Sequence, residues 1–431
     1  MYKLSIGSLK NSIRGRFAAD SLRFPSNLKT LAAIILVASS CASAQTLTTI
    51  YNFGFGPADG ANPQAGLVLD NSGILFGTTA LGGTPRSNGT AFRLKLGAGG
   101  GWNEKVLHRF QGPKDGSQPL GRLTVTSSGK VFGTASAGGT NGKGTAFVLT
   151  PPAVPGGPWT TKVLYNFGGS ATDGASPNAR LLAANPGFYG VTRDGGSNGA
   201  GTVFQLKAAA GSSWTETVLY SFGFAPDAAF PAGELVADKN GNLYGTTTLG
   251  GINNQGAVYQ LAPPPITGGP WTETVIYSFN GTDGTLPGGG LQFDAKGKLS
   301  GTTNGGGAQS GGTVFQLTPP AIKGNPWTQA VLFDFSGGSL DGGSPSAGVI
   351  FYKGSLFGTA SSGGAGGAGA VFQLAPPVGG HGPWTETILH SFTSRDGFAP
   401  RSQLVQKNGI FYGTTSQGGV FGTGTVFALL P

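Results

Sequence analysis

Polar and apolar side chains alternate in the stretch WTETVLYSF, and from Thr215 to Phe222 the alternation has the two-residue period of a half-buried strand. Three more apolar bursts follow: ELVAD at Glu234–Asp238, NLYGTT at Asn242–Thr247 and GAVYQL at Gly256–Leu261. The residues DKNG separate the second burst from the third, as expected for a hairpin turn. The pattern predicts four short strands per unit, and no 3.6-residue periodicity is visible after the first 44 residues.

The same unit recurs along the whole chain. The six tryptophans are spaced 55 to 57 residues apart, and QTLTTIYNF, which begins at Gln45, is a degraded copy of the phrase that each tryptophan opens. This gives seven units that start near residues 45, 102, 159, 214, 271, 327 and 384. Each unit contains one phenylalanine, hereafter the marker phenylalanine: Phe53, Phe110, Phe167, Phe222, Phe279, Phe335 and Phe392.

Seven repeats of four short strands predict an all-β, seven-bladed β-propeller of four-stranded antiparallel blades. A solenoid is the alternative, but it is expected to have atypical capping repeats, and the end units here resemble the middle ones. We expect the strand at Gln45–Phe53 to pair with Gly424–Leu430 in the last blade, because pairing of the two termini closes the ring and removes an open edge.

The first 44 residues differ from the rest and predict a signal peptide. Basic residues precede the apolar run at Leu31–Ser40, and CASAQ supplies a small-x-small cleavage site that ends at Ala44. The run is too short to span a membrane. Lipidation at Cys41 is the alternative to cleavage after Ala44. We therefore expect an exported protein (periplasmic, cell-surface or extracellular) with a single domain over residues 45–431 and no transmembrane segment.

Composition and charge narrow the function classes. The chain has 80 glycines and 28 prolines, but 38% of its residues are hydrophobic and they recur in regular bursts, which argues against disorder. Loss of the leader reduces the formal net charge from +9 to +4 and removes the only cysteine. The remaining basic residues form no run, so nucleic acid is not indicated as a partner. We expect a monomer that is stabilised by packing rather than by disulfides.

At the level of motifs, the chain resembles the GloVer-type tandem-repeat proteins, also called choice-of-anchor repeat proteins. The resemblance rests on LYGTT–x–x–GG, G(T/A)VFQL, PP…GGPWTETVLYSF and DG–x–x–P, and it covers essentially all of Gln45–Pro431. It implies export and a C-terminal anchoring signal. This chain ends in TVFALLP, so we expect a secreted form or anchoring by another route. The resemblance implies no activity, cofactor or catalytic residue.

Several repeated residues are candidate functional groups, and each also has a structural interpretation. The motif DG–x–x–P places one acidic residue in each unit, and these could bind Ca²⁺, but a turn rigidified by proline is favoured because each loop holds one carboxylate. We therefore predict no cofactor. These residues are Asp59, Asp115, Asp173, Asp227, Asp283, Asp341 and Asp396.

The glycine of YGTT–x–x–GG is present in every unit. A phosphate cradle would need a helix behind it, so we expect these glycines to serve tight hairpins and close backbone approach near the axis. They are Gly77, Gly133, Gly190, Gly245, Gly301, Gly358 and Gly413.

Histidine and tryptophan also have structural interpretations. His108 and His390 occupy a position that is tyrosine in four other units, so we expect them to pack, and His381 lies in a proline-rich loop. No catalytic triad or His/Cys metal site is indicated. The tryptophans could stack on sugar rings, but packing between blades is favoured.

Departures from the repeat are the best candidates for a binding site, because a scaffold position repeats and a site need not. At the residue that opens the second strand, Arg122, Arg180 and Glu234 replace the residues of the other four units, which are Gly66, Gly290, Gly348 and Gln403. In the third unit, Arg193 and Asp194 replace small or neutral residues. We expect these five charges to gather on one sector of one face, near the channel mouth, and to bind a carboxylate or sulfate group. Solvated surface variation is the alternative.

The sequence therefore predicts a secreted propeller that acts as a binding or display scaffold for extracellular or cell-envelope polysaccharide, or for a protein. An enzyme that acts on acidic polysaccharide, a hydrolase or lyase, is the alternative, and Glu234 and Asp194 are its only local candidates. A structural surface or matrix component is a further alternative. This step from fold to function is an analogy.

Overall fold

The computed structural model describes residues 45–431 except 84–86, 267, 323 and 381. The predicted signal peptide and His381 lie outside these residues. The described chain is all-β apart from two three-residue 3₁₀ segments, η1 (Ala210–Ser212) and η2 (Val378–Gly380).

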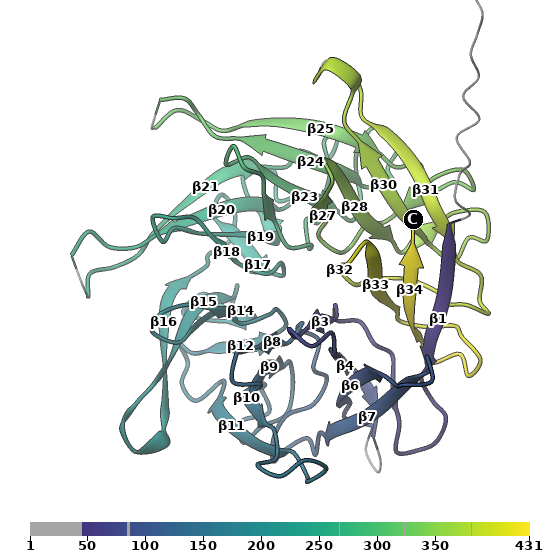
Figure 1. Cartoon of the computed structure of the whole chain (residues 1–431). Coiled ribbons are helices and arrows are strands. Elements are labelled where there is room, and N and C mark those ends of the chain that lie inside the picture. The colour runs from purple at the N-terminus through teal and green to yellow at the C-terminus, as the bar shows by residue number, and fades with distance from the viewer. Residues whose placement is uncertain (1–44, 84–86, 267, 323, 381) are drawn as a thin grey trace, which may run out of the picture. The chain divides into compact units, whose positions relative to one another are not determined.

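Seven antiparallel sheets follow one another in a ring, which confirms the seven-bladed propeller (Figure 1). Each blade is named here by its order in the chain, and its strands are given from the channel outward. Blade 1 contains β3 (Val68–Leu69), β4 (Leu75–Thr79), β6 (Thr90–Leu96) and β7 (Trp102–Arg109). Blade 2 contains β8 (Thr124–Val125), β9 (Val131–Ala135), β10 (Thr145–Thr150) and β11 (Thr160–Asn166).

The middle blades repeat this arrangement, and two of them have an added short strand. Blade 3 contains β12 (Gly174–Pro177), β13 (Leu182–Ala183), β14 (Phe188–Gly195), β15 (Thr202–Ala208) and β16 (Trp214–Ser221). Blade 4 contains β17 (Ala228–Pro231), β18 (Val236–Ala237), β19 (Leu243–Gly250), β20 (Ala257–Ala262) and β21 (Thr272–Ser278). Blade 5 contains β22 (Gln292–Phe293), β23 (Leu299–Thr303), β24 (Thr313–Thr318) and β25 (Thr328–Asp334).

The last two blades complete the ring. Blade 6 contains β27 (Ile350–Tyr352), β28 (Ser355–Ala360), β30 (Ala370–Ala375) and β31 (Thr385–Ser391). Blade 7 contains β32 (Val405–Lys407), β33 (Ile410–Thr415), β34 (Thr425–Leu430) and, as its outer strand, β1 (Thr46–Asn52).

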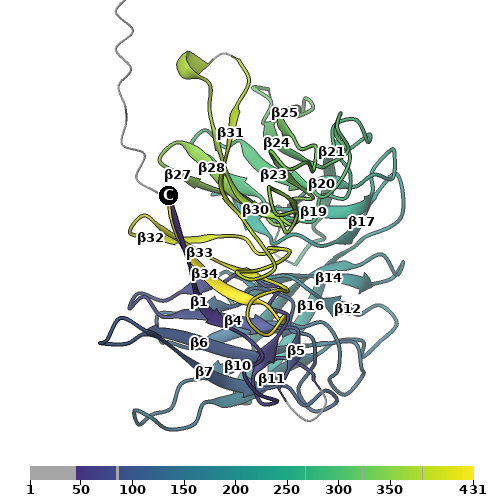
Figure 2. The same ribbon diagram turned by 90° about the vertical axis from the view of Figure 1, so that its right-hand side faces the viewer.

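The first strand of the chain closes the ring, as predicted. β1 pairs antiparallel with β34, from Thr46 opposite Leu430 to Asn52 opposite Thr425, and the two strands run side by side in both views (Figures 1 and 2). The first and last units therefore share one sheet, and the solenoid alternative is wrong.

Each blade connects to the next through a crossover, the segment that runs from the marker phenylalanine to the inner strand and contains the repeated aspartate and proline. The crossover pairs with the loop after the YGTT strand: β2 (Gly60–Ala61) with β5 (Leu81–Gly82), and β26 (Gly342–Gly343) with β29 (Ser362–Gly363). In blades 3 and 4, β12 and β17 make the same pairing with β14 and β19. The two kinds of loop therefore share one face, as predicted, and it is called the crossover face below.

The repeated glycine of YGTT lies within a strand, not in a hairpin. It pairs across the sheet with an aromatic residue of the third strand, as Gly77 does with Phe92 and Gly301 with Phe315. In every unit, a Cβ at this glycine would come within 2.7 Å of that aromatic side chain. The ring in turn packs edge-on against the marker phenylalanine, as Phe92 does against Phe53. The expected close approach is present, but it involves a side chain that crosses over the glycine.

The blades adhere through apolar contacts at their interfaces. One buried cluster joins Phe53, Phe92 and Leu94 to Tyr412 and Val426, so it spans blades 1 and 7. Tryptophans at the start of the outer strand pack on an aromatic residue of the preceding blade, as Trp102 does on Tyr412 and Trp271 on Tyr189. Packing between blades is thus what the structure shows for these tryptophans.

A backbone hydrogen bond recurs at all seven interfaces between blades. The residue before each crossover proline has a positive φ of 51° to 59°, and its N–H donates to a carbonyl of the preceding blade over 2.7 to 3.0 Å. Asn62 donates in this way to Thr423, which joins blade 1 to blade 7. The proline itself lies on a glycine of the preceding blade, since a Cβ at that glycine would come within 2.8 Å of the ring.

We predict that Gly301→Ala destabilises the protein by about 1–3 kcal/mol, because its Cβ would lie 2.7 Å from Cζ of Phe315 in a packed interface. A lower thermal unfolding midpoint would show this. The control is Gly56→Ala, whose Cβ would meet nothing within 4 Å. Equal midpoints for the two variants would contradict the packing role of the glycine.

Candidate functional site

A cavity of about 140 Å³ lies at the centre of the ring and is lined by residues from all seven blades. They come from three successive positions that follow the crossover prolines, and the middle position contributes only small residues, Ala65, Ala179, Gly289 and Ala347. The residue directly after the proline forms the rim: Gln64, Leu120, Asn178, Ala232, Gly288, Ser346 and Arg401. Two residues further along the chain, Gly66, Arg122, Glu234, Gly290, Gly348 and Gln403 form the floor. Arg180 occupies the equivalent position in blade 3; it is not among the residues that line the cavity, but it contacts Glu234, which is.

An ion pair crosses the floor of the cavity. Arg122 of blade 2 donates from Nε to Oε1 of Glu234 over 2.9 Å and from Nη2 to Oε2 over 2.6 Å, so the pair is bidentate. Glu234 belongs to blade 4, so the contact passes over blade 3. The comparison of repeats selected both residues without showing a contact, and in the structure they bind each other. The prediction that Glu234 opens the second strand is wrong, because β18 begins two residues later, at Val236.

The glycines of the floor make room for these long side chains. A Cβ at Gly66 would lie 3.1 Å from Cδ of Arg122, and one at Gly290 would lie 3.3 Å from Cβ of Glu234. Gln403 fills the corresponding space above Gly348. The narrow channel accommodates only some large side chains in this layer, so charged residues in some blades require glycine in others.

Arg180 joins the same group but is only partly satisfied. Its Nη1 lies 3.9 Å from Oε2 of Glu234, and its buried Nε has no hydrogen-bond partner among the described residues. Burial lowers the pKa of Arg180, the neighbouring Arg122 lowers it further, and Glu234 opposes them. The geometry therefore leaves a guanidinium that an incoming anion would stabilise.

The rim contains polar residues that the sequence analysis missed. Arg401, Asn178 and Ser346 line the cavity, and Asn178 Oδ1 and Ser346 Oγ are buried without a partner among the described residues. The rim position also departs from the repeat, since other units carry Leu120, Ala232 or Gly288 there. The comparison that selected Arg122 would have found Arg401 if it had been applied two residues earlier.

Arg193 and Asp194 lie apart from this cavity. Both belong to β14 on the crossover face, where Asp194 pairs with Ala175 of β12. The side chain of Arg193 is exposed, and neither residue is among those that line the cavity. The structure brings Arg122, Arg180 and Glu234 together but does not add these two to the group, so their role in binding stays a prediction.

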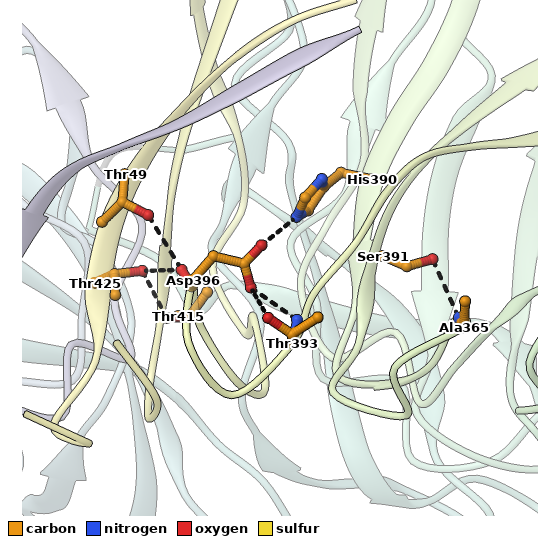
Figure 3. Close-up of polar contacts among 8 residues, drawn as sticks. All are labelled: Thr49, Ala365, His390, Ser391, Thr393, Asp396, Thr415 and Thr425. Atoms are coloured by element: carbon orange, nitrogen blue, oxygen red, sulfur yellow. Dashed lines mark hydrogen bonds and ion pairs between the residues drawn. The ribbon is translucent and has the colours of Figure 1, made fainter. Parts of the chain in front are cut away.

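The repeated aspartates tie each crossover to the strand before it. Asp59 accepts hydrogen bonds from the N–H groups of Gly54 and Phe55 and from the hydroxyl of Tyr51. His390 takes the place of the tyrosine in blade 6, with Nε2 at 2.8 Å from Asp396, and the same aspartate accepts from Thr393 (Figure 3). His108 contacts Asp115 in the same way. The carboxylates therefore accept hydrogen bonds within their own turns, and both histidines have a structural role as partners of these carboxylates.

Four glutamates lie near these aspartates and have raised pKa values. Burial is the main cause in each case, and the nearby aspartate adds to it: burial and Asp173 raise the pKa of Glu216 to about 8, and burial and Asp227 raise that of Glu273 to about 8. Glu104 and Glu386 are raised to about 7. One oxygen of each glutamate is buried without a partner in the described part of the chain.

Calcium binding at the aspartate loops stays a hypothesis. Within the described residues, no three His, Cys, Asp or Glu side chains gather in a way that could hold a metal ion. Calcium loops normally concentrate several oxygen ligands.

The raised glutamate pKa values predict that stability falls as the pH rises. Between about pH 4.5 and pH 8 the folded chain holds protons that the unfolded chain has released, so this stabilisation is full below pH 4.5 and is lost by about pH 8. Glu273→Gln, which copies Gln329 of the next unit, should flatten the fall in thermal midpoint between pH 5 and pH 9. The reverse change Gln329→Glu should steepen it, and parallel curves would contradict the assignment.

Several solved structures resemble this fold. The extracellular domain of a candidate one-component system from B. thetaiotaomicron matches with a TM-score of 0.50 and 11% identity, over 89% of this chain and 42% of that one. A candidate 6-phosphogluconolactonase from Bacteroides uniformis matches with a TM-score of 0.49 and 13% identity, over 81% and 89%. A surface component of the type-IX secretion system of Porphyromonas gingivalis, PorZ, matches with a TM-score of 0.41 and 12% identity, over 84% and 52%. At such identities the likeness shows the fold alone.

The helix content and the sequence family of the chain complete this description. In the described part of the chain, no helix is long and apolar enough to cross a membrane. No curated protein matches the sequence. A family model described as the Gloeobacter/Verrucomicrobia repeat matches residues 88–292 and 266–431, which confirms the resemblance that the motifs indicated. Since these stretches cover most of the chain, the protein belongs to the Gloeobacter/Verrucomicrobia repeat family.

Proposed function

We propose that this protein is an exported binding scaffold that holds a carboxylate group of its ligand in the central cavity. The observation that carries the proposal is the charge of this cavity. Arg122 lies on the floor, Arg401 lies on the rim and Arg180 contacts Glu234 of the floor, and Glu234 is the one carboxylate among the described residues of the same group. Excess positive charge in a concavity attracts anions and concentrates them there.

The arginines have different roles in this proposal. Arg122 is held by both oxygens of Glu234, so it shapes the floor and is not free to bind. Arg180 has an unpartnered Nε within the described structure, and Arg401 is exposed on the rim. These two guanidiniums are the ones that we expect to bind the anion, because a planar fork of N–H donors matches a carboxylate.

The remaining polar groups of the rim indicate what accompanies the carboxylate. Asn178 Oδ1 accepts hydrogen bonds, and Ser346 Oγ donates and accepts them. A ligand with hydroxyl or amide N–H groups beside its carboxylate would satisfy them. Acidic sugars and acidic peptides both have this chemistry, which agrees with the polysaccharide or protein partner expected from the sequence.

The geometry favours binding over the enzyme alternative. A hydrolase or lyase would need a free base or a pair of carboxylates beside the arginines. Both oxygens of Glu234 accept hydrogen bonds from Arg122, and Asp194 is not among the residues that line the cavity. A structural matrix component would not need unpartnered polar groups in a cavity. Export rests on the predicted signal peptide over residues 1–44.

The proposal predicts that Arg180→Ala/Arg401→Ala lowers the affinity for acidic polymers at least about tenfold, because each lost guanidinium removes a charge-assisted contact with the ligand. Binding of polygalacturonate and polyglutamate would be measured by calorimetry at low and at physiological salt. The matched control is Arg395→Ala/Lys239→Ala, which removes the same charge from exposed positions outside the cavity lining. Failure of both polymers to bind the unaltered chain, or equal affinity of both variants, would contradict the proposal.

A further inference from the structure

The crossover face exposes an unusual share of the large apolar side chains. Among the described residues fifteen such side chains are exposed, and nine of them lie in crossovers or in the loops that pair with them. These nine are Phe55, Leu81, Phe224, Ile252, Leu286, Leu340, Phe398, Val420 and Phe421. Exposed apolar side chains that gather on one face mark a surface that another molecule covers.

Two of these residues occupy the same repeat position in different blades. Phe55 and Phe224 each stand two residues after the marker phenylalanine, where the other five units carry glycine or serine. Their side chains are 83% and 60% exposed, so neither contributes much to the core. They begin the crossovers into blades 1 and 4, three blades apart in one direction and four in the other. They therefore lie on opposite sides of the central cavity.

Each phenylalanine anchors a small apolar patch. Phe55 contacts Phe421 with 6.2 Å between ring centroids, and Val420 lies beside Phe421 in the same loop. Phe224 contacts Phe230 with 6.0 Å between centroids, and Phe230 and Leu249 pack at the same interface between blades. We call these two groups the Phe55 patch and the Phe224 patch.

One member of the Phe55 patch departs from the repeat. Phe421 occupies the position of Asn141, Asn198 and Asn253, and each of these asparagines donates a hydrogen bond to the carbonyl of a marker phenylalanine. A phenylalanine cannot make this bond, and in blade 7 the hydroxyl of Thr423 donates to the carbonyl of Phe53 instead. Because the scaffold does not need Phe421 for this contact and the residue is 45% exposed, its apolar surface is available to another molecule.

From these features we infer that a protein partner docks on the crossover face, with an acidic side chain in the central cavity and apolar side chains on the two patches. The inference rests on the proposed function, because it uses the same cavity as the anion site. Aliphatic residues such as Ile252, Val420 and Leu286 supply neither hydrogen bonds for sugar hydroxyls nor flat rings that stack on the C–H face of a sugar, and they favour an apolar protein surface. Exposed phenylalanines around an arginine match the residue types that dominate protein interfaces.

The size of the cavity agrees with this partner. A volume of about 140 Å³ is close to that of an engineered cavity that holds benzene, and one Asp or Glu side chain fits such a space. The carboxylate would be bound by Arg180 and Arg401 at the centre, while the patches on either side bury apolar surface. An arrangement of a desolvated central contact and apolar contacts around it is typical of interfaces with a few dominant residues.

The test selects peptides from a random displayed library on the whole chain and measures the affinity of one enriched synthetic peptide. We expect enriched peptides to carry Asp or Glu between apolar residues. Phe55→Ser/Phe421→Ser and, separately, Phe224→Ser should each weaken the peptide at least about tenfold. The matched control Val154→Ser/Ile322→Ser changes exposed apolar residues in proline-rich loops and should bind as the unaltered chain does. Equal melting temperatures would show that all variants fold.

The outcomes separate this inference from the proposed function. If no acidic peptide is enriched, or if the phenylalanine variants bind the peptide unchanged, the protein partner is refuted. If the same variants lose polygalacturonate while the peptide is unaffected, the patches serve a polysaccharide and the inference is wrong, although the anion site stands. If Arg180→Ala/Arg401→Ala binds the peptide and both polymers normally, the anion site fails and the inference fails with it.

Discussion

The hydrogen bond from the residue before each crossover proline to the preceding blade is the constraint on which the rest of the structure depends. The donor has a left-handed backbone, which for residues such as Phe230 or Leu286 is uncommon and costs on the order of 1 kcal/mol. The proline that follows fixes the exit direction of the chain and contacts a glycine of the preceding blade. Because this arrangement occurs seven times, it sets where the crossover delivers the chain to the inner strand of each blade.

The cavity follows from that constraint. The residues one and three positions after the proline point toward the axis in every blade, so the ring presents two layers of seven positions each. Threonines of the YGTT strands bond the carbonyl between these positions in the neighbouring blade, as Thr134 does to Ala179 and Thr302 to Ala347. These hydrogen bonds fix the backbone of both layers, so the blades differ at the axis only in their side chains. A scaffold of this kind keeps its backbone while the residues at the axis change.

Much of the fold could be predicted from sequence, because each unit repeats its own strand pattern and residues 45–53 match the strand that the last blade lacks. The role of Gly301 was harder to predict, since the sequence does not show that Phe315 lies opposite it on the neighbouring strand. The contact of Arg122 with Glu234 could not be predicted, because a whole blade lies between them in the sequence and only the closed ring brings their side chains together. Arg401 could have been found by the same comparison of repeats, whereas only the three-dimensional structure shows that Asn178 Oδ1 has no partner among the described residues.

The pairing of β1 with β34 sets the order of events when the chain is made. Thr46 lies opposite Leu430, so the outer strand of blade 7 waits for residues at the far end of the sequence. Closure of so long a loop carries a large entropic penalty, and contacts of this kind form slowly. A chain that emerges from its N-terminal end cannot complete this sheet until nearly all of it has been released. Until then β1 has no partner strand, and an unpaired strand can pair with another chain and aggregate.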